Sequence, residues 1–302
     1  MKKTTLFEII IKSLIITAFS LIMFSLPLPA AENLKLEKIS TRVYAVLPAE
    51  GGKAFANSSF ILLDDGVFVI DSQSSEELSL ELISIIKKTT DKPIKYLLNT
   101  HFHNDHTEGN GSFAPDARII LHGSTLAKLE AKGSNLSYPL ITTNCGMTLN
   151  YKDFPIQILW MGKAHTDGDL LVYLPAEKIL IAGDIFFNQT IPYTKDGHIG
   201  DWLVAIQRTL ELDFNKIVPG HGPIADRTEF MRFRELLAWA KAVADSERAK
   251  GTEKERIPEA ARQTELYKSR IVHYTHQERL ADLLESAYQE IIRLKTRFNM
   301  QK

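Results

Sequence analysis

The sequence predicts an α/β fold in which two β-sheets lie inside and helices cover them on the outside. Three observations predict it. Short apolar runs with strand character alternate with helical segments, the alternation occurs in two similar halves, and further helical segments close the chain. Alternating strands and helices favour layered α/β architectures, and 302 residues are enough for a sizeable buried core.

The first half begins with strand-like residues 35–47, which Gly51 and Gly52 interrupt. Two apolar runs follow at residues 58–63 and 67–70. Asp64-Asp65-Gly66 joins them, and this turn sequence predicts a β-hairpin.

A helix and a strand complete the first half. Ser74 with Glu77 three residues later predicts a capping box, and Leu82, Ile85 and Ile86 form one apolar face behind it. Residues 94–98 are expected to form a short strand that leads directly into a group of histidines.

The second half has the same outline. We expect strands at residues 117–121, 156–161, 170–174, 179–182 and 217–218, and helices at residues 124–131 and from a capping Asp201 through Leu212. The expected strands at residues 156–161, 179–182 and 217–218 each end close to a glycine.

Helical segments are expected at residues 229–248 and 277–297, with the charged residues 251–258 as a connector. The last helix has one apolar face, formed by Leu280, Leu284, Ala287, Ile291 and Leu294. We therefore expect a main domain at residues 31–250 and a C-terminal helical extension at residues 251–302.

The N-terminal residues have the composition of a secretory signal peptide. Lys2, Lys3 and Lys12 precede an apolar run that ends in small residues, so residues 1–30 are expected to be removed on export. The alternative is a retained membrane anchor, although Lys12 interrupts the apolar run. We expect a periplasmic or secreted protein without a stable membrane anchor after cleavage.

Composition excludes several classes of function. The formal net charge is −1, and no basic stripe predicts nucleic-acid binding. Cys145 is the single cysteine, which excludes an internal disulfide and a multi-thiolate zinc site. Any metal must therefore be held by nitrogen and oxygen atoms.

The sequence T-H-F-H-N-D-H at residues 100–106 is the strongest functional signal. If it follows a strand, His101 and His103 can face one metal, and Asp105 and His106 can reach a second one. Imidazole and carboxylate ligands suit Zn²⁺, although iron or manganese would accept the same set.

Three further residues follow expected strands and lie beside glycines: His165, Asp184 and His221. A single histidine in a loop is usually solvated, and a single aspartate before a helix is usually a cap. Their shared placement at strand ends, where sites collect, favours a joint role.

These motifs resemble the metallo-β-lactamase superfamily over about residues 40–225, from Asp71 through H-x-H-x-D-H, His165, Asp184 and His221. The resemblance implies a four-layer αβ/βα sandwich and a hydrolase with two Zn²⁺ ions. His101, His103 and His165 would hold the first metal, and Asp105, His106 and His221 the second.

The resemblance also implies roles for the remaining residues. Asp184 would bridge both metals together with a hydroxide that attacks a carbonyl. Asp105 would orient that hydroxide, and Asp71 would hold a ligand imidazole through its outer N–H. Tyr193 could donate a hydrogen bond to a developing oxyanion, and the loop of residues 50–57, with Phe55 and Asn57, could contact a small-molecule substrate.

The sequence leaves the substrate open. The signal peptide and residues 147–149 and 171–175 resemble subclass B1 β-lactamases, which carry Cys and Arg where this chain has Asp184 and His106. Those two residues instead match glyoxalase II, lactonases and quinoprotein-associated metallohydrolases. The hypothesis that we favour is that the substrate is a β-lactam or a related cyclic amide or ester. The alternative is a lactone or thioester. The non-enzymatic hypothesis is a binding protein that has the metal site but no turnover. The oligomeric state is not predicted.

Overall fold

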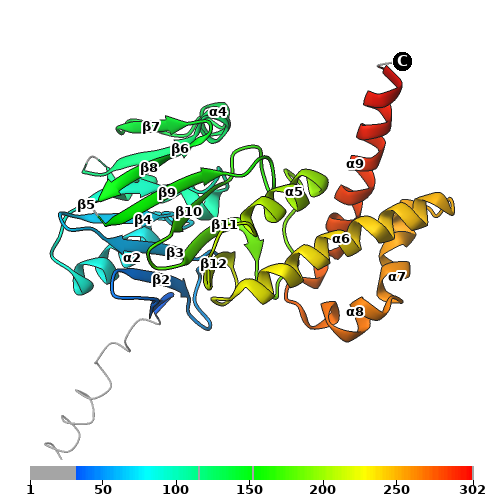
Figure 1. Ribbon diagram of the computed structural model, residues 1–302, viewed down its shortest axis with the longest axis horizontal. Helices are drawn as coiled ribbons and strands as arrows, with labels where there is room; N and C mark the ends of the chain where they lie inside the picture. The colour runs from blue at the N-terminus through cyan, green and yellow to red at the C-terminus, as the bar shows by residue number, and fades with distance from the viewer. Residues whose placement is uncertain (1–31, 115, 152, 301–302) are drawn as a thin grey trace, which may run out of the picture. The chain divides into compact units, whose positions relative to one another are not determined.

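Two β-sheets form the centre of the structure, which is a computed structural model (Figure 1). It describes residues 32–300 except positions 115 and 152, and the expected signal peptide lies outside the described residues. The seven strands of the first sheet lie in chain order: β1 (Leu34–Lys38), β2 (Val43–Pro48), β3 (Ser58–Leu62), β4 (Val67–Ile70), β5 (Ile94–Leu98), β6 (Arg118–His122) and β7 (Leu140–Thr143). The second sheet has the order β12 (Lys216–His221), β11 (Ile179–Phe187), β10 (Leu170–Leu174), β9 (Phe154–Trp160) and β8 (Gly146–Tyr151).

The helices are distributed over the outer faces of the two sheets. They are α2 (Glu76–Thr89), α3 (Asn104–Thr107), α4 (Gly123–Ala131), α5 (Ile199–Thr209), α6 (Arg227–Ala249), α7 (Ile257–Arg262), α8 (Glu265–Ser269) and α9 (Leu280–Met300). Short 3₁₀ turns are η1 (Asn110–Phe113), η2 (Lys254–Arg256), η3 (Ile271–His273) and η4 (Gln277–Arg279).

The side chains of each strand point alternately to the two faces of its sheet, and this produces the four layers. In β10, Leu170, Val172 and Leu174 pack between the sheets, whereas Leu171 and Tyr173 face the helices of the second sheet. Because successive side chains of a strand point to opposite faces, a fully buried strand serves two cores at once. The outer core of the first sheet includes residues of α2 and α4, and that of the second sheet includes residues of α5 and α6. The predicted four-layer α/β sandwich is thus confirmed.

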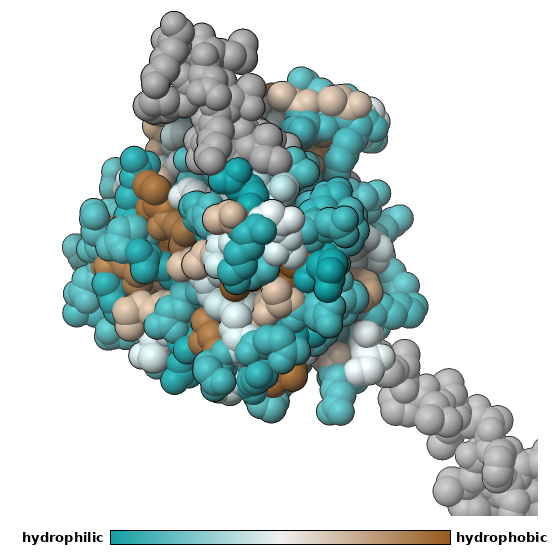
Figure 2. Space-filling model, turned by 90° about the vertical axis from the view of Figure 1, so that its right-hand side faces the viewer, coloured by the Kyte–Doolittle hydropathy of each residue, from teal (hydrophilic) through white to brown (hydrophobic). Residues whose placement is uncertain are grey.

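The C-terminal helices share the outer core of the second sheet. Leu280, Leu284 and Ala287 of α9 are buried there, and the Glu290 carboxylate accepts hydrogen bonds from the Gly200 amide of α5 at 2.8 and 3.0 Å. The face over these helices is mainly hydrophilic, with apolar side chains scattered among polar ones (Figure 2). None of the helices in the described part of the chain is long and apolar enough to cross a membrane.

Several expected elements differ from the structure. Residues 35–47 form two antiparallel strands, β1 and β2, because Ser40 stabilises a turn between them by accepting from the Val43 amide. The cap of α2 is Ser75, whose hydroxyl accepts from Leu78 N at 3.2 Å, so the capping pair Ser74 and Glu77 was wrong by one residue.

The second half shows further differences. Asp201 lies inside the first turn of α5 and does not cap it; at this end of the helix the Glu290 carboxylate accepts from the Gly200 amide. The strands β7 and β8 were not predicted, since both are only half-buried and lack an apolar run. The expected connector at residues 251–258 contains η2 and the start of α7.

Candidate metal centre

The candidate site lies at one edge of both sheets. Strands β4 and β5 are parallel, as are β11 and β12, so their carboxyl ends meet at this edge. Two backbone hydrogen bonds join the sheets there, from Leu170 N to Thr100 O at 2.8 Å and from Asn57 N to Gly220 O at 2.8 Å. The loops that follow these strands therefore converge.

All seven residues expected as metal ligands are brought together in two neighbouring groups. The first group, which we call cluster 1, contains His101, His103, His165 and Asp184, and the second, cluster 2, contains Asp105, His106 and His221. Within each cluster the potential ligand atoms lie within 4.8 Å of one another.

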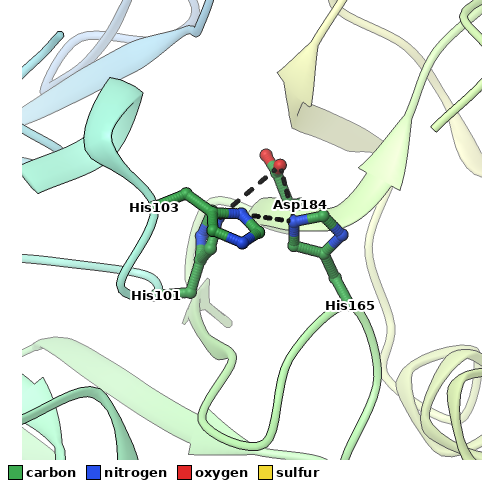
Figure 3. A group of neighbouring side chains, drawn as sticks. All are labelled: His101, His103, His165 and Asp184. Carbon is green, nitrogen blue, oxygen red and sulfur yellow. Dashed lines mark hydrogen bonds and ion pairs between the residues drawn. The ribbon is translucent and has the colours of Figure 1, made fainter. Parts of the chain in front are cut away.

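In cluster 1, three imidazole nitrogens and one carboxylate oxygen face a common point (Figure 3). His103 Nδ1 lies 2.9 Å from both His101 Nε2 and His165 Nε2, and Asp184 Oδ2 lies 3.2 Å from His165 Nε2 and 3.7 Å from His101 Nε2. Four ligands at about 2.0–2.1 Å around a tetrahedral Zn²⁺ would be about 3.3 Å apart. The observed separations bracket that value.

In cluster 2, two imidazoles face two carboxylates. His221 Nε2 lies 3.3 Å from both Asp105 Oδ2 and Asp184 Oδ2. His106 Nε2 lies 3.2 Å from Asp184 Oδ1 and 3.6 Å from Asp105 Oδ2. Asp184 therefore contacts both clusters, with one oxygen facing His106 and the other facing the remaining histidines.

The outer nitrogens of four rings have partners that determine where the protons lie, whereas His165 Nδ1 is buried without a hydrogen-bond partner among the described residues. His103 Nε2 contacts Asp196 Oδ2 at 3.0 Å, His106 Nδ1 contacts Asp71 Oδ2 at 2.8 Å, and His221 Nδ1 contacts the Phe55 carbonyl at 3.0 Å. Because all three partners are acceptors, each outer nitrogen carries the proton of the neutral ring. The inner nitrogens then carry lone pairs.

His101 follows the same rule through Thr100. The Thr100 hydroxyl donates to Asp71 Oδ2 at 2.9 Å, so at 3.1 Å it accepts from His101 Nδ1. The lone pair of His101 Nε2 then faces that of His103 Nδ1, which is repulsive unless a cation lies between them. His106 Nε2 and Asp184 Oδ1 are both buried and lack an aligned hydrogen-bond partner among the described residues. The residues thus fit a pair of metal ions.

Two glycines allow Asp184 to occupy its position. Gly183 has φ of +50°, and a Cβ there would meet the Thr100 side chain. A Cβ on Gly220 would overlap Asp184 Oδ1. Glycine is required at both places because the backbone of each approaches a site residue closely.

Charge and burial set the protonation of the metal-free site. Burial lowers the pKa of His165 to about 3 and the pKa of His101 well below its ordinary value. Burial would also lower the pKa of His221, but Asp184 and Asp105 raise it to about 9, and the surrounding carboxylates likewise raise the pKa of His106. The imidazoles of cluster 1 are therefore neutral in the metal-free protein. The imidazoles of cluster 2 are protonated until a bound cation replaces their protons.

Asp71 follows β4 and is buried at 2% exposure with φ of +62°. Its carboxylate accepts from Thr100 N at 2.8 Å, from the Thr100 hydroxyl and from His106 Nδ1. Burial raises the pKa of this carboxyl, while the three donors oppose that shift. Asp71 thus orients the segment that carries His101 and the ring of His106.

The other expected residues lie around the clusters. The ring of Tyr193 is 5.3 Å from that of His103, and burial raises the pKa of its hydroxyl. Phe55 is 67% exposed at the cleft beside His221. Asn57, expected at the substrate loop, is buried and donates to the carbonyls of Pro219 and Gly222, so it holds the segment that carries His221.

Sequence reasoning missed Asp196 and the segment at residues 273–276. Asp196 contacts His103 from the loop between β11 and α5, well beyond the end of the strand, and no local motif marks it. His273 and His276, which showed no surrounding motif in the sequence, line the same cleft as His221.

Comparison with known proteins gives consistent matches. The family model described as "Metallo-beta-lactamase superfamily" matches residues 51–141 and 153–221. The chain is 25% identical over 201 residues to "Metallo-beta-lactamase type 2" of Bacillus cereus, covering 65% of this chain and 78% of that protein. It is 31% identical over 163 residues to "2,4-dinitroanisole O-demethylase subunit alpha" of Nocardioides sp. (strain JS1661), covering 52% and 50%. The solved "Metallo-beta-lactamase from Pontibacter korlensis" matches with a TM-score of 0.60 at 24% identity, covering 68% of this chain and 99% of that one.

Proposed function

Because the chain belongs to the metallo-β-lactamase superfamily, whose members are metal-dependent hydrolases, we propose that it is an exported dinuclear zinc hydrolase. Its preferred substrate is a β-lactam or a related cyclic amide or ester. The observation that carries the proposal is the inward orientation of the imidazole lone pairs around Asp184, which contacts both clusters. A bound pair of metal ions supplies Lewis acidity and makes water nucleophilic at neutral pH.

The residues of this chain have defined tasks in that reaction. His101, His103 and His165 would hold the first metal, Asp105, His106 and His221 would hold the second, and Asp184 lies between the two groups. Burial alone would raise the pKa of Asp105, but His106 and His221 hold it below its ordinary value, so this carboxylate is ionised. At 28% exposure it reaches the open side of the site, where it can accept a hydrogen bond from the attacking water.

Tyr193 acts on the opposite side of the reacting carbonyl. Its raised pKa keeps the hydroxyl protonated at neutral pH, so that it can donate to an oxygen that becomes negative. The ring lies against His103 and His165 of cluster 1, which is where the polarised carbonyl oxygen would be held.

A second candidate function is hydrolysis of a lactone or thioester. It is favoured by Asp184 and His106, because the subclass B1 enzymes that the sequence resembles carry Cys and Arg at these positions. The relative named as a 2,4-dinitroanisole O-demethylase subunit adds an aryl ether to the possible substrates.

Metal analysis and one substrate panel test the proposal. Zinc-loaded protein is expected to bind two metals per chain and to hydrolyse nitrocefin, and His165→Ala is expected to lose both properties while the surface variant Asp64→Ala keeps them. Fewer than about two metals at saturating zinc would contradict the dinuclear site. Absence of nitrocefin hydrolysis at any enzyme concentration would end the β-lactam proposal, and turnover of a lactone, a thioester or 2,4-dinitroanisole would replace it.

Export is a separate part of the proposal and rests on the sequence of residues 1–30. Periplasmic protein is expected to begin at or next to Ala31 when its N-terminus is sequenced. Recovery of the intact N-terminus from the membrane fraction would favour the retained anchor.

A further inference from the structure

A cleft of about 520 Å³ opens beside His221 of cluster 2. One side is formed by the loop that carries Phe55, and the other by residues 188–190 together with residues 273–276. The match to the family model ends at residue 221, so the last of these segments belongs to the part of the chain beyond that match.

Hydrogen bonds connect the walls to His221. The His221 ring donates to the Phe55 carbonyl at 3.0 Å, and the His221 carbonyl accepts from Asn188 N at 2.9 Å. His221 therefore lies between the two walls and forms the end of the cleft that meets the metal site.

The C-terminal segment is held in place by a short parallel pairing with residues 189–191. Thr275 N donates to Gln189 O at 3.0 Å, Ile191 N donates to Thr275 O at 3.1 Å, and the hydroxyls of Thr190 and Thr275 lie 2.8 Å apart. These bonds link residues about 85 positions apart in the sequence. They place His273 and His276 beside the cleft without any contribution from their own side chains.

Two residues at this pairing have left-handed backbone conformations. Gln189 has φ of +55° and His276 has φ of +58°, although neither is glycine. Such conformations are energetically unfavourable for a non-glycine residue and persist where the surrounding structure enforces them, often at binding sites. Both residues line the cleft, so the strain lies where it shapes the wall.

The cleft combines polar lining residues, among them Lys35 and Glu37, with a smaller set of apolar and aromatic side chains that suit a flat ring. Phe55 is 67% exposed, and Pro48 and Pro223 line the cleft close to it. The exposed imidazoles of His273 and His276 are on the other wall. Aromatic side chains on both sides of a cleft favour an aromatic ring between them.

We propose that residues 273–276 form a specificity wall of the substrate cleft, and that the cleft takes an aromatic substituent of the substrate. The proposal rests on the hydrolytic function proposed above and adds the substrate class. Clusters 1 and 2 define which bond is cleaved, and the C-terminal segment selects which aromatic substituent is accepted.

Two ligands that differ only by a phenyl ring test the proposal by binding alone. N-phenylacetylglycine and N-acetylglycine share an amide and a carboxylate, so both can approach the metals equally, and neither contains a strained ring. Isothermal titration of the zinc-loaded full chain is expected to show about tenfold tighter binding of the phenylacetyl compound, because the ring is removed from water.

The variants separate the two walls. Phe55→Ala and the double variant His273→Ala with His276→Asn are each expected to reduce the preference to less than about threefold. Asparagine keeps the left-handed backbone at position 276. Val272→Ala is the matched control, because Val272 is exposed next to His273 and lies outside the cleft lining, and it is expected to keep the tenfold preference.

Equal binding of the two ligands by the unmodified chain, or a preference that survives both variants, would overturn the proposal. The result is independent of turnover. If the chain hydrolyses no substrate but keeps the variant-dependent binding preference, the proposed hydrolytic function is contradicted and the proposed role of the cleft is supported. If the chain is an active hydrolase without the preference, the proposed function is supported and the role of the cleft is contradicted.

Discussion

Replacing Asp71 by asparagine keeps the size of the side chain and removes one hydrogen-bond acceptor. Asp71 Oδ1 accepts from Thr100 N, whereas Oδ2 accepts from both the Thr100 hydroxyl and His106 Nδ1. An amide nitrogen in place of Oδ2 would face two donors. The least costly response is for His106 to move its proton to Nε2, so that Nδ1 can accept from the new amide.

That change of tautomer removes the lone pair that faces cluster 2. His106 Nε2 lies 3.2 Å from Asp184 Oδ1, and with a proton it can no longer hold a metal. Loss of an orienting partner typically lowers metal affinity by about 10–100-fold. The effect should fall on the second metal, because the outer nitrogens of His103 and His221 have other partners.

The same substitution should destabilise the metal-free protein. The charge-assisted hydrogen bond from the Thr100 hydroxyl, at about 1.5–3 kcal/mol, is lost and the contact with His106 becomes a weaker neutral one, while the removal of one buried charge offsets part of that loss. We expect a decrease of about 2–4 kcal/mol in the free energy of unfolding. Asp65→Asn is the control, because Asp65 is a solvent-exposed partner of Lys95 in the β3–β4 turn.

Competition with a chromogenic chelator measures both metal affinities. The expected result is one zinc bound as tightly as in the unmodified protein and a second bound about 10–100-fold more weakly. Two zinc ions bound with unchanged affinity would refute the assignment of the His106 tautomer and the orienting role of Asp71.

Three further predictions concern the two clusters. Gly220→Ala should displace Asp184 and reduce the zinc content below one ion per chain, whereas Gly111→Ala, where a Cβ meets nothing within 4 Å, should leave it unchanged. Asp196→Asn should lower the affinity for the first metal by up to about tenfold in chelator competition. The unfolding midpoint should not change, because Asp196 is one-third exposed. An unchanged metal affinity would show that this contact does not orient the His103 ring. Because the pKa of His221 in the metal-free protein is raised to about 9, zinc binding at pH 7.5 should release at least one proton, and zinc affinity should increase as the pH rises toward 9. Calorimetry in buffers of different ionisation enthalpy measures the number of protons released. A value of zero would contradict the protonated state of cluster 2.

The sequence was sufficient to predict which residues converge, because most of the candidate ligands follow or end strands; Asp184, expected after a strand, instead lies inside β11, next to a register shift at Gly183. The carboxyl ends of neighbouring strands meet at one edge, so His101 after β5 and His221 at the end of β12 come together by topology alone. The β3–β4 hairpin was predictable for a similar reason, since its turn residues act locally.

Contacts between distant segments were not predictable. Asp196 contacts a residue 93 positions earlier, and Thr275 pairs with Thr190 through backbone atoms that leave no trace in the side-chain pattern. The cap of α5 shows the same limit, because Asp201 has the right local position but Glu290 of α9 supplies the hydrogen bonds. Where two residues have equally suitable local sequence positions, contacts with distant segments determine which one forms the hydrogen bond.

The surroundings of Asp184 connect the metal chemistry with the choice of substrate. One oxygen lies 3.2 Å from His106 of cluster 2. The other lies 3.2 Å from His165 of cluster 1 and 3.3 Å from His221 of cluster 2, so it faces both clusters while the first oxygen adds a contact to cluster 2. A cysteine, as in the subclass B1 enzymes that the sequence resembles, offers one sulfur at this position. The missing Cβ of Gly220 leaves space for the second oxygen, so the backbone is adapted to a carboxylate. The cluster is then composed entirely of nitrogen and oxygen ligands, a set that zinc shares with iron and manganese. The metal that is bound and the substrate that is preferred both depend on Asp184. Hydrolysis of a β-lactam, a lactone and a thioester must therefore be compared on one protein preparation of known metal content.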